Sequence, residues 1–409
     1  MLSINGERFL GHLHALGRIG VDAEGRRTRQ AATDEDRLGR ETVIGWMKEA
    51  GLRVELDRVG NIYGFWETEE NAGRAPFAMG SHIDTVIDAG QYDGCAGVLS
   101  GLEVIQTMKE AGLRPARPLA LVVFTNEEGT RLHPDMVGSL TIAGGISVED
   151  ALASPGTDGT TLGAELARIH ALGDREPTDF RPAYFIELHI EQGPVLDAEQ
   201  TPIGAVTSIQ GISWHEITID GAANHAGTTP TSMRRDAGLA AAKVLVFLRE
   251  RCTRPGSRTV ATAGRMAFSP NAVNVIPGRA VFTVDMRCPD EQELQENEQA
   301  LYDFLASLEQ SDHVSATARR MVRFQPVVFD GTIVQTVLDA AAARDLKARP
   351  IASGAGQDAQ MISRVCPTAM IFVPSVGGVS HSPKEFTADG DLVNGANVLL
   401  DAACRLANA

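Results

Sequence analysis

Five side chains of metal-binding type lie in five separate segments of this chain, and each segment has the character of a strand end or a tight loop. They are His82 in GSHIDTV, Asp93 in QYDGCAGV, Glu128 in FTNEEGTR, His189 in IELHIEQGP and His381 in GGVSHSPKE. Imidazole and carboxylate ligands together favour zinc, manganese or cobalt over calcium. Two imidazoles and a carboxylate can hold one metal ion. If one carboxylate is shared, the five side chains can hold two ions. The chain is therefore predicted to gather these segments around a pair of divalent ions, as in a dinuclear hydrolase.

The length and composition of the chain limit its organisation and its partners. A chain of 409 residues exceeds the usual size of one hydrophobic core, so two domains are expected. The formal net charge of −16 repels a phosphate backbone, so we expect neither a nucleic acid nor a membrane as partner. No apolar run approaches the roughly 20 residues that span a bilayer, and the N-terminus lacks the order of a signal peptide. Five widely spaced cysteines fit free thiols in a reducing compartment, which predicts a cytoplasmic location.

The first 200 residues alternate helical and strand patterns, as in an α/β domain. The expected strands cover residues 77–79, 119–125 and 184–189, and the expected helices cover residues 34–51 and 97–111. Along one face of the first helix we expect Leu38, Val43, Ile44 and Met47. The candidate ligands lie at the carboxyl ends of the strands, and this is the edge where open α/β sheets bind their ligands.

A second pattern begins near residue 211. It predicts strands over residues 215–219, 258–266, 280–286 and 314–318, and helices over residues 236–252 and 291–308. The resulting order β-α-β-β-α-β is that of a ferredoxin-like unit. From about residue 329 the first pattern returns. We therefore predict a catalytic metal-binding domain formed by residues 1–210 and 329–409, into which residues 211–328 are inserted.

Nine strings of this sequence are similar, in order and spacing, to a known family. They are GSHIDTV, YDGCAGV, TNEEG, HIEQGP, NHAGTTPTSMRRDA, NVIPG, DMR, SGAGQDA and GGVSHSPKE. Together they resemble the metal-dependent amidohydrolases of the hydantoinase/carbamoylase family, within the aminoacylase and carboxypeptidase superfamily. The resemblance implies an aminopeptidase-like catalytic domain, an inserted ferredoxin-like dimerisation or lid domain, and a homodimer. It also implies hydrolysis of an N-carbamoyl or ureido group on an amino-acid-like acid.

The same resemblance implies how the candidate ligands divide between two metal ions per subunit. His82, Asp93 and His189 would hold one ion, while Asp93, Glu128 and His381 would hold the other, so that Asp93 is the bridge. Zinc or manganese is the expected metal, with cobalt or nickel as alternatives.

Two further acids have predicted roles beside the metals. Asp84 is expected to accept the second ring proton of His82, and Glu127 to act as the general base that takes a proton from water and passes it to the departing nitrogen. Adjacent acids such as Glu127 and Glu128 are usually solvated surface charges. Here they follow the apolar run LALVVFT, and a buried strand would aim them into a cleft.

Four residues are predicted by resemblance to bind the substrate. Arg287 in DMR maps onto the carboxylate clamp, with Asn274 in NVIPG beside it. His225 in NHAG resembles the histidine that reaches across the dimer to stabilise the developing oxyanion, and Gln192 in IEQGP resembles the residue that contacts the ureido group. Because three of these residues belong to the inserted domain, closure of that domain would assemble the site.

One residue departs from the family pattern. The family commonly reads SGAGHDA, whereas this chain has Gln357 at the position of the histidine that touches the substrate. Glutamine donates a hydrogen bond but cannot become a cation. The expected activity is that of an N-carbamoyl-L-amino acid amidohydrolase; the alternatives are an allantoate amidohydrolase or another ureido-acid hydrolase of the β-ureidopropionase type. An aminoacylase or dipeptidase is disfavoured by NHAGTTPTSMRRDA, and an inactive metal-bound binding protein is disfavoured by the intact Glu127.

Overall fold

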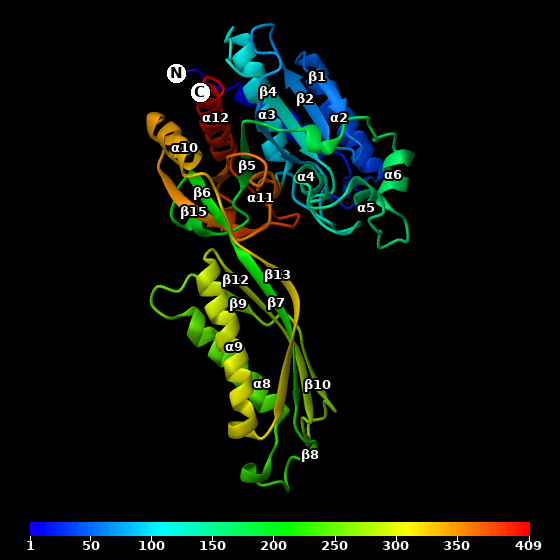
Figure 1. The fold of residues 1–409 in the computed structure, drawn as a ribbon, viewed down its shortest axis with the longest axis vertical. Coiled ribbons are helices and arrows are strands. Elements are labelled where there is room, and N and C mark those ends of the chain that lie inside the picture. Colours follow the sequence, from blue (N-terminus) through cyan, green and yellow to red (C-terminus); the bar gives the residue numbers. More distant parts are fainter. The chain divides into compact units, whose positions relative to one another are not determined.

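The computed structural model describes residues 1–409, whose contacts divide the chain into two compact units. Unit 1 comprises Met1–Thr207 and Phe329–Ala409, and unit 2 comprises Ser208–Val328. Both chain termini belong to unit 1, so the sequence enters unit 2 once and returns (Figure 1). None of the helices is both long and apolar enough to cross a membrane.

Unit 1 is built on one mixed sheet. Its strands are β1 (Arg53–Leu56), β2 (Ile62–Trp66), β3 (Phe77–His82), β4 (Leu119–Phe124), β5 (Tyr184–Ile190), β6 (Ile203–Ile209), β15 (Ala348–Ser353) and β16 (Thr368–Val373). They run in the order β1-β2-β4-β3-β5-β16-β6, with β15 also paired to β6. The four central strands β4, β3, β5 and β16 are parallel to one another. Every residue of β3, β4 and β16 is buried, as expected for parallel strands that are covered on both faces.

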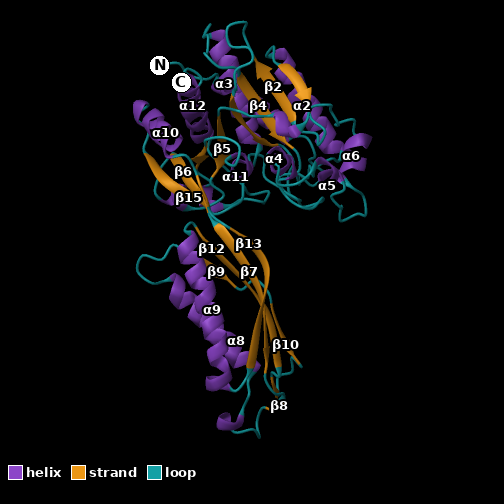
Figure 2. Ribbon diagram, in the orientation of Figure 1, coloured by secondary structure: helices purple, strands orange, loops and turns teal.

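Helices surround this sheet (Figure 2). They are α1 (Gly6–Gly17), α2 (Asp34–Glu49), α3 (Cys95–Glu110), α4 (Val137–Ile142), α5 (Val148–Leu152), α6 (Leu162–Arg168), α7 (Val195–Ala198), α10 (Gly331–Ala343), α11 (Asp358–Ile362) and α12 (Asp389–Leu406). One group, α1, α3, α10 and α12, packs together, and α3 and α12 also contact the central strands. A second group, α4 and α11, packs together, with α11 on β5 and β16. The fold is thus a mixed α/β fold, as predicted.

Unit 2 contains an antiparallel sheet and two long helices. Its elements are β7 (Gly211–Asp220), β8 (Asn224–His225), α8 (Ala237–Cys252), β9 (Val260–Thr262), β10 (Met266–Ser269), β11 (Val275–Ile276), β12 (Arg279–Cys288), α9 (Glu291–Asp312), β13 (Ser315–Phe324) and β14 (Val327–Val328). The sheet has the order β10-β12-β7-β13, with β9 also paired to β12. The single strand predicted over residues 258–266 is wrong, because β9 ends at Thr262 and β10 begins only at Met266, and the two strands pair with different parts of β12.

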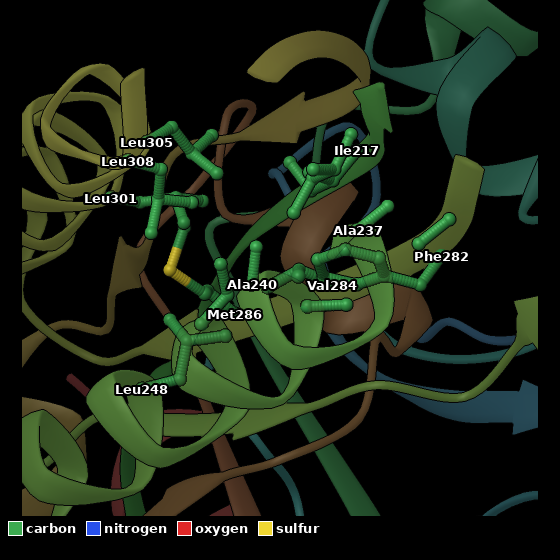
Figure 3. Packing of buried hydrophobic residues seen from close by; sticks show 14 of the residues in the cluster. Ile217, Ala237, Ala240, Leu248, Phe282, Val284, Met286, Leu301, Leu305 and Leu308 are labelled. Atoms are coloured by element: carbon green, nitrogen blue, oxygen red, sulfur yellow. The ribbon is translucent and has the colours of Figure 1, made fainter. Parts of the chain in front are cut away.

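Unit 2 has a hydrophobic core of its own, formed by one face of the sheet and the two helices (Figure 3). Buried residues alternate with less buried ones along β7 and β12, the period expected when one face of a strand packs inward. On the helices, the buried positions recur every three or four residues. The labelled core residues are Ile217, Ala237, Ala240, Leu248, Phe282, Val284, Met286, Leu301, Leu305 and Leu308.

Candidate metal centre

The five predicted metal ligands lie together at the carboxyl edge of the parallel strands of unit 1. His82 is the last residue of β3, and His189 is the penultimate residue of β5. Glu128 follows β4, Asp93 lies just before α3, and His381 lies in the loop after β16. Neighbouring parallel strands end on the same side of a sheet, so side chains distant in sequence converge there.

His82, Asp93 and His189 form the first group of potential ligands. Oδ1 of Asp93 is 3.6 Å from Nε2 of His82 and 3.1 Å from Nε2 of His189. The Nδ1 atoms of the two rings face backbone carbonyls, that of Asp84 at 2.9 Å and that of Ile190 at 2.9 Å. Each neutral ring therefore carries its proton on Nδ1, and its Nε2 lone pair is directed at a carboxylate oxygen.

This arrangement fits a divalent cation. Two lone pairs facing a carboxylate repel it unless positive charge lies between them, and atoms bound tetrahedrally to one zinc ion at about 2.0–2.2 Å lie about 3.3–3.6 Å apart. Nε2 of His82 and Oε1 of Glu128 are buried and have no hydrogen-bond partner in the protein. Burial lowers the pKa of His82, but Glu127 and Asp93 outweigh it and raise that pKa well above the ordinary value. A positive charge between these side chains, supplied by a proton or by a metal ion, is therefore strongly favoured.

Asp93, Glu128 and His381 form a second group, which shares Asp93 with the first. Nε2 of His381 lies 3.3 Å from Oδ2 of Asp93 and 3.5 Å from Oε2 of Glu128. The hydrogen bond with Asp93 raises the pKa of His381 to about 9, and burial raises the pKa of Glu128 to about 8. Asp93 therefore faces the first group through Oδ1 and the second group through Oδ2.

Glu127 lies within reach of the same cluster. Its Oε2 is 3.5 Å from Nε2 of His82, and His82, Glu127 and Glu128 form a third group in which the potential ligand atoms lie within 4.8 Å of one another. Burial raises the pKa of Glu127 well above its usual range. The geometry is compatible with Glu127 as base and with Glu127 as ligand, so the predicted division between the two acids stays a prediction.

The predicted contact of Asp84 is corrected by the structure. Nδ1 of His82 lies 2.9 Å from the backbone carbonyl of Asp84, whereas the carboxylate oxygen is 3.8 Å away. The Asp84 carboxylate instead accepts hydrogen bonds from the backbone amides of Glu127 and Glu128, each at 3.3 Å. Asp84 therefore orients His82 through its main chain and holds the Glu127–Glu128 turn through its side chain.

Gln192 and Gln357 extend the cluster through a chain of hydrogen bonds. Nε2 of Gln192 donates to Oδ2 of Asp93 at 2.8 Å, and Nε2 of Gln357 donates to Oε1 of Gln192 at 2.8 Å. An ionised carboxylate only accepts, so Gln192 must present its NH₂ group to Asp93. Its oxygen must then accept from Gln357. Asp93 therefore fixes the amide orientation of Gln192, and Gln357, the residue that departs from the family pattern, donates to the oxygen that Gln192 presents.

The other predicted substrate residues belong to unit 2. His225 and Asn274 lie on neighbouring segments, because the amide of Ala226 donates to the carbonyl of Asn274 at 2.9 Å. Nδ1 of His225 accepts hydrogen bonds from the amides of Gly227 and Thr228, at 3.0 and 3.2 Å. Both bonds require a lone pair on Nδ1, so the neutral ring carries its proton on Nε2 and can donate from there.

Arg287 lies at the other end of the sheet of unit 2, so within one subunit Asn274 is not beside it as predicted, and their shared contact with a substrate stays a prediction. Along β12, Arg279 pairs with Asp220 and Arg287 pairs with Ile212, at opposite ends of β7. Eight residues of extended strand separate the two arginines, which corresponds to about 26 Å. The β8–β11 ribbon, with Asn274 at its edge, follows the Asp220 end.

The Arg287 guanidinium hydrogen bonds to a neighbour on its own strand. Its Nη2 donates to the carboxylate of Asp285 at 3.0 Å. This contact holds the planar group in a defined orientation, and its predicted role in binding a carboxylate stays a prediction.

Four polar residues of the centre were not predicted from the sequence. The hydroxyl of Ser380 is 3.3 Å from Oδ2 of Asp93, and the carboxylate of Glu385 accepts from the amide of Asp93 at 3.3 Å. Buried Glu187 and Asp358 accept hydrogen bonds from serine hydroxyls. All four lie inside strings that carry recognised residues. Their position in these strings was the available signal, but residue type alone does not distinguish them from surface acids.

The family of the chain follows from comparison with known proteins. Residues 78–405 match the profile of Peptidase family M20/M25/M40, so the chain belongs to this family. It is 37% identical over 404 residues to an N-carbamoyl-L-amino-acid amidohydrolase of Rhizobium meliloti, covering 99% of this chain and 97% of the relative. It is 34% identical to an allantoate amidohydrolase of Bacillus subtilis, over 97% of this chain and 96% of the relative.

A solved structure resembles the chain over its whole length. This is an amidase of the hydantoinase/carbamoylase family from Burkholderia multivorans, with a TM-score of 0.97, 40% sequence identity, and coverage of 100% of this chain and 99% of the other. The prediction of an amide-bond hydrolase related to this family is thereby confirmed.

Proposed function

We propose that this protein hydrolyses the ureido C–N bond of N-carbamoyl-L-amino acids, with two divalent ions of zinc or manganese per subunit. The main observation behind the proposal is that Asp93 faces two sets of potential ligands and that Glu127 lies beside them. The match to an N-carbamoyl-L-amino-acid amidohydrolase over nearly the full length of both chains supports the same activity.

The chemistry of a ureido group explains why such a centre is needed. Two nitrogens donate into its carbonyl, which makes it a weak electrophile, and neutral water is a weak nucleophile. A bound pair of divalent cations supplies Lewis acidity for the carbonyl and lowers the pKa of water. In the proposed reaction Glu127 accepts the proton that the attacking water loses and returns it to the departing nitrogen. The NH₂ group of Gln192 donates to the ureido oxygen, and Arg287 pairs with the acid group of the substrate.

The proposal also requires a homodimer. The two ends of the sheet of unit 2 are about 26 Å apart, so one small substrate cannot contact both ends in a single subunit. If His225, Asn274 and Arg287 all act on it, Arg287 must come from one copy of the chain, and His225 and Asn274 from another. We infer that Arg287 works with the partner subunit's His225 and the partner subunit's Asn274, with closure of the inserted unit bringing the groups together.

Subunit complementation tests this dimer. Arg287→Ala and His225→Ala subunits, each strongly impaired on the free acid as a homodimer, are co-expressed with different tags, and mixed dimers are isolated. An isolated mixed dimer has both residues intact at one of its two sites, so it should regain about one half of the wild-type activity. Activity no higher than the sum of the two parent variants would contradict the shared site.

Replacing Arg287 by alanine should weaken binding of a free acid. Loss of the guanidinium leaves a desolvated carboxylate unpaired, which costs about 2 to 4 kcal/mol. KM for an N-carbamoyl amino acid should rise accordingly, whereas KM for its amide or ester should barely change. Arg319→Ala is the matched control, because Arg319 also pairs with an acid on a strand of unit 2 but is far more exposed. An equal rise in KM for the acid and for the ester would show that Arg287 does not bind the acid group of the substrate.

A substrate panel tests the activity itself. It contains N-carbamoyl amino acids, allantoate, ureidoglycolate and N-acyl amino acids, and both ammonia and amine release are measured. Hydrolysis of an N-carbamoyl amino acid releases both products, whereas an N-acyl amino acid releases an amine without ammonia. Faster turnover of allantoate than of any N-carbamoyl amino acid would favour the alternative, an allantoate amidohydrolase. Amine release from N-acyl substrates alone would contradict both.

The variant Gln357→His tests the departure from the family pattern. A histidine in this position adds a charge-assisted hydrogen bond, worth about 1 to 2 kcal/mol, where glutamine gives a neutral one. Activity on simple N-carbamoyl amino acids should rise, and a pH dependence near the histidine pKa of about 6.5 should appear that the parent lacks. A variant that retains both metals but is slower on every ureido substrate would indicate that Gln357 is tuned to another substrate.

A further inference from the structure

Glu385 is a buried acid that holds two loops of the metal centre together. It is 6% exposed, and its Oε1 accepts hydrogen bonds from the backbone amides of Tyr92 and Asp93, at 3.0 and 3.3 Å. Its Oε2 accepts a hydrogen bond from the hydroxyl of Ser380 at 3.1 Å. One carboxylate thus contacts the segment that carries Asp93 and the residue next to His381.

Ser380 connects the same two loops a second time. Its hydroxyl lies 3.3 Å from Oδ2 of Asp93, the oxygen that also faces His381 at 3.3 Å. A hydroxyl has one proton, so Ser380 donates to Asp93 or to Glu385 at a given moment. In either case it stays between the two carboxylates. The relative position of Asp93 and His381 therefore depends on the contacts of Glu385.

The chain leaves space for Glu385 at Gly90. A Cβ atom at position 90 would lie 2.1 Å from Oε1 and 2.2 Å from Cδ of Glu385. The backbone of Gly90 does not have the positive φ that would by itself require glycine. The requirement at position 90 is thus for space, and that space is occupied by the Glu385 side chain.

We propose that Glu385 is a positioning residue for the metal centre. By fixing the backbone at Asp93 and the loop at His381, it holds the second group of ligands in place before an ion binds. Such outer partners of ligands typically change metal affinity about 10- to 100-fold when they are lost. The inference rests on the proposed metal centre and adds a residue that touches neither the ion nor the substrate.

The test compares Glu385→Ala, Gly90→Ala and the double variant with the wild type. Each protein is stripped of metal, and the dissociation constants for Zn²⁺ and Mn²⁺ are measured by competition with a chromophoric chelator. Each single variant should bind one of its two ions, that of the second group of ligands, about 10- to 100-fold less tightly. The double variant should be no worse than Glu385→Ala, because both changes remove the same contacts. Glu385→Gln should lose less affinity, since its remaining oxygen can still accept from the amides.

A matched control separates positioning from general stability. Asp57 is also a buried carboxylate of unit 1 that accepts from backbone amides, but it contacts no potential metal ligand. Asp57→Asn should lower the melting temperature of the metal-stripped protein without changing metal affinity. If the Glu385 and Gly90 variants also lower only the melting temperature, Glu385 merely supports the fold and the inference is wrong. A wild type that binds no divalent ion would overturn the metal centre as well, so the two failures are distinguishable.

Discussion

The variant Glu127→Gln is expected to lose about two to four orders of magnitude in kcat while keeping both metal ions, because this is the usual contribution of a general base. Glutamine preserves the shape of the side chain but cannot accept the proton of the attacking water. KM should change little, since Glu127 is not expected to bind the substrate in its ground state. Metal content is measured by mass spectrometry on the same preparation that is used for kinetics.

Glu128→Gln is the matched control, because it makes the same chemical change one residue away. Glu128 faces His381 at 3.5 Å, and the loss of its charge should weaken metal binding. The geometry makes this comparison necessary, since Oε2 of Glu127 lies 3.5 Å from Nε2 of His82 and could itself bind an ion. If Glu127→Gln loses metal and Glu128→Gln keeps it, the two roles are reversed.

Asp93→Asn is expected to lose both metal ions, and with them all measurable activity. Asp93 belongs to both proposed ligand groups and is 6% exposed, so no water-exposed group can replace its charge. His381→Ala, by contrast, removes a member of the second group alone and should lose one ion. The Asp93 variant should remain folded in the absence of metal, because it removes one negative charge from a cluster of buried acids. Tight retention of one ion by Asp93→Asn would contradict the shared ligand.

Much of the α/β framework could be predicted because its strands are long apolar runs. The expected strand over residues 119–125 corresponds to β4, Leu119–Phe124, and the expected strand over residues 184–189 to β5, Tyr184–Ile190. Helix α2 was found where predicted, but its apolar face was partly wrong. Leu38 is 46% exposed, whereas Asp36 and Arg40 are buried as an ion pair with a distance of 2.8 Å. Their burial depends on partners remote in sequence, which helical periodicity does not reveal.

The grouping of the five candidate ligands could be predicted because the strings that carry them are distinctive. The contacts that neighbouring residues make with these ligands could not be predicted. Asp84 was expected to contact His82 through its carboxylate, but the backbone carbonyl is nearer, and a sequence does not distinguish these two acceptors. Asn274 was placed beside Arg287 because both follow the same family pattern. The pairing of β12 with β7 separates them within one subunit, and strand register is a property of the folded sheet.

The most direct test of the proposed dinuclear hydrolase is a metal titration of the stripped protein with turnover as the readout. Zn²⁺ or Mn²⁺ is added in fractions of an equivalent, and hydrolysis of an N-carbamoyl-L-amino acid is measured at each step. With both groups of ligands occupied in the active form, activity should rise to its maximum at two equivalents and be absent before metal is added. Full activity at one tightly bound equivalent, or in excess chelator after verified metal removal, would contradict the account.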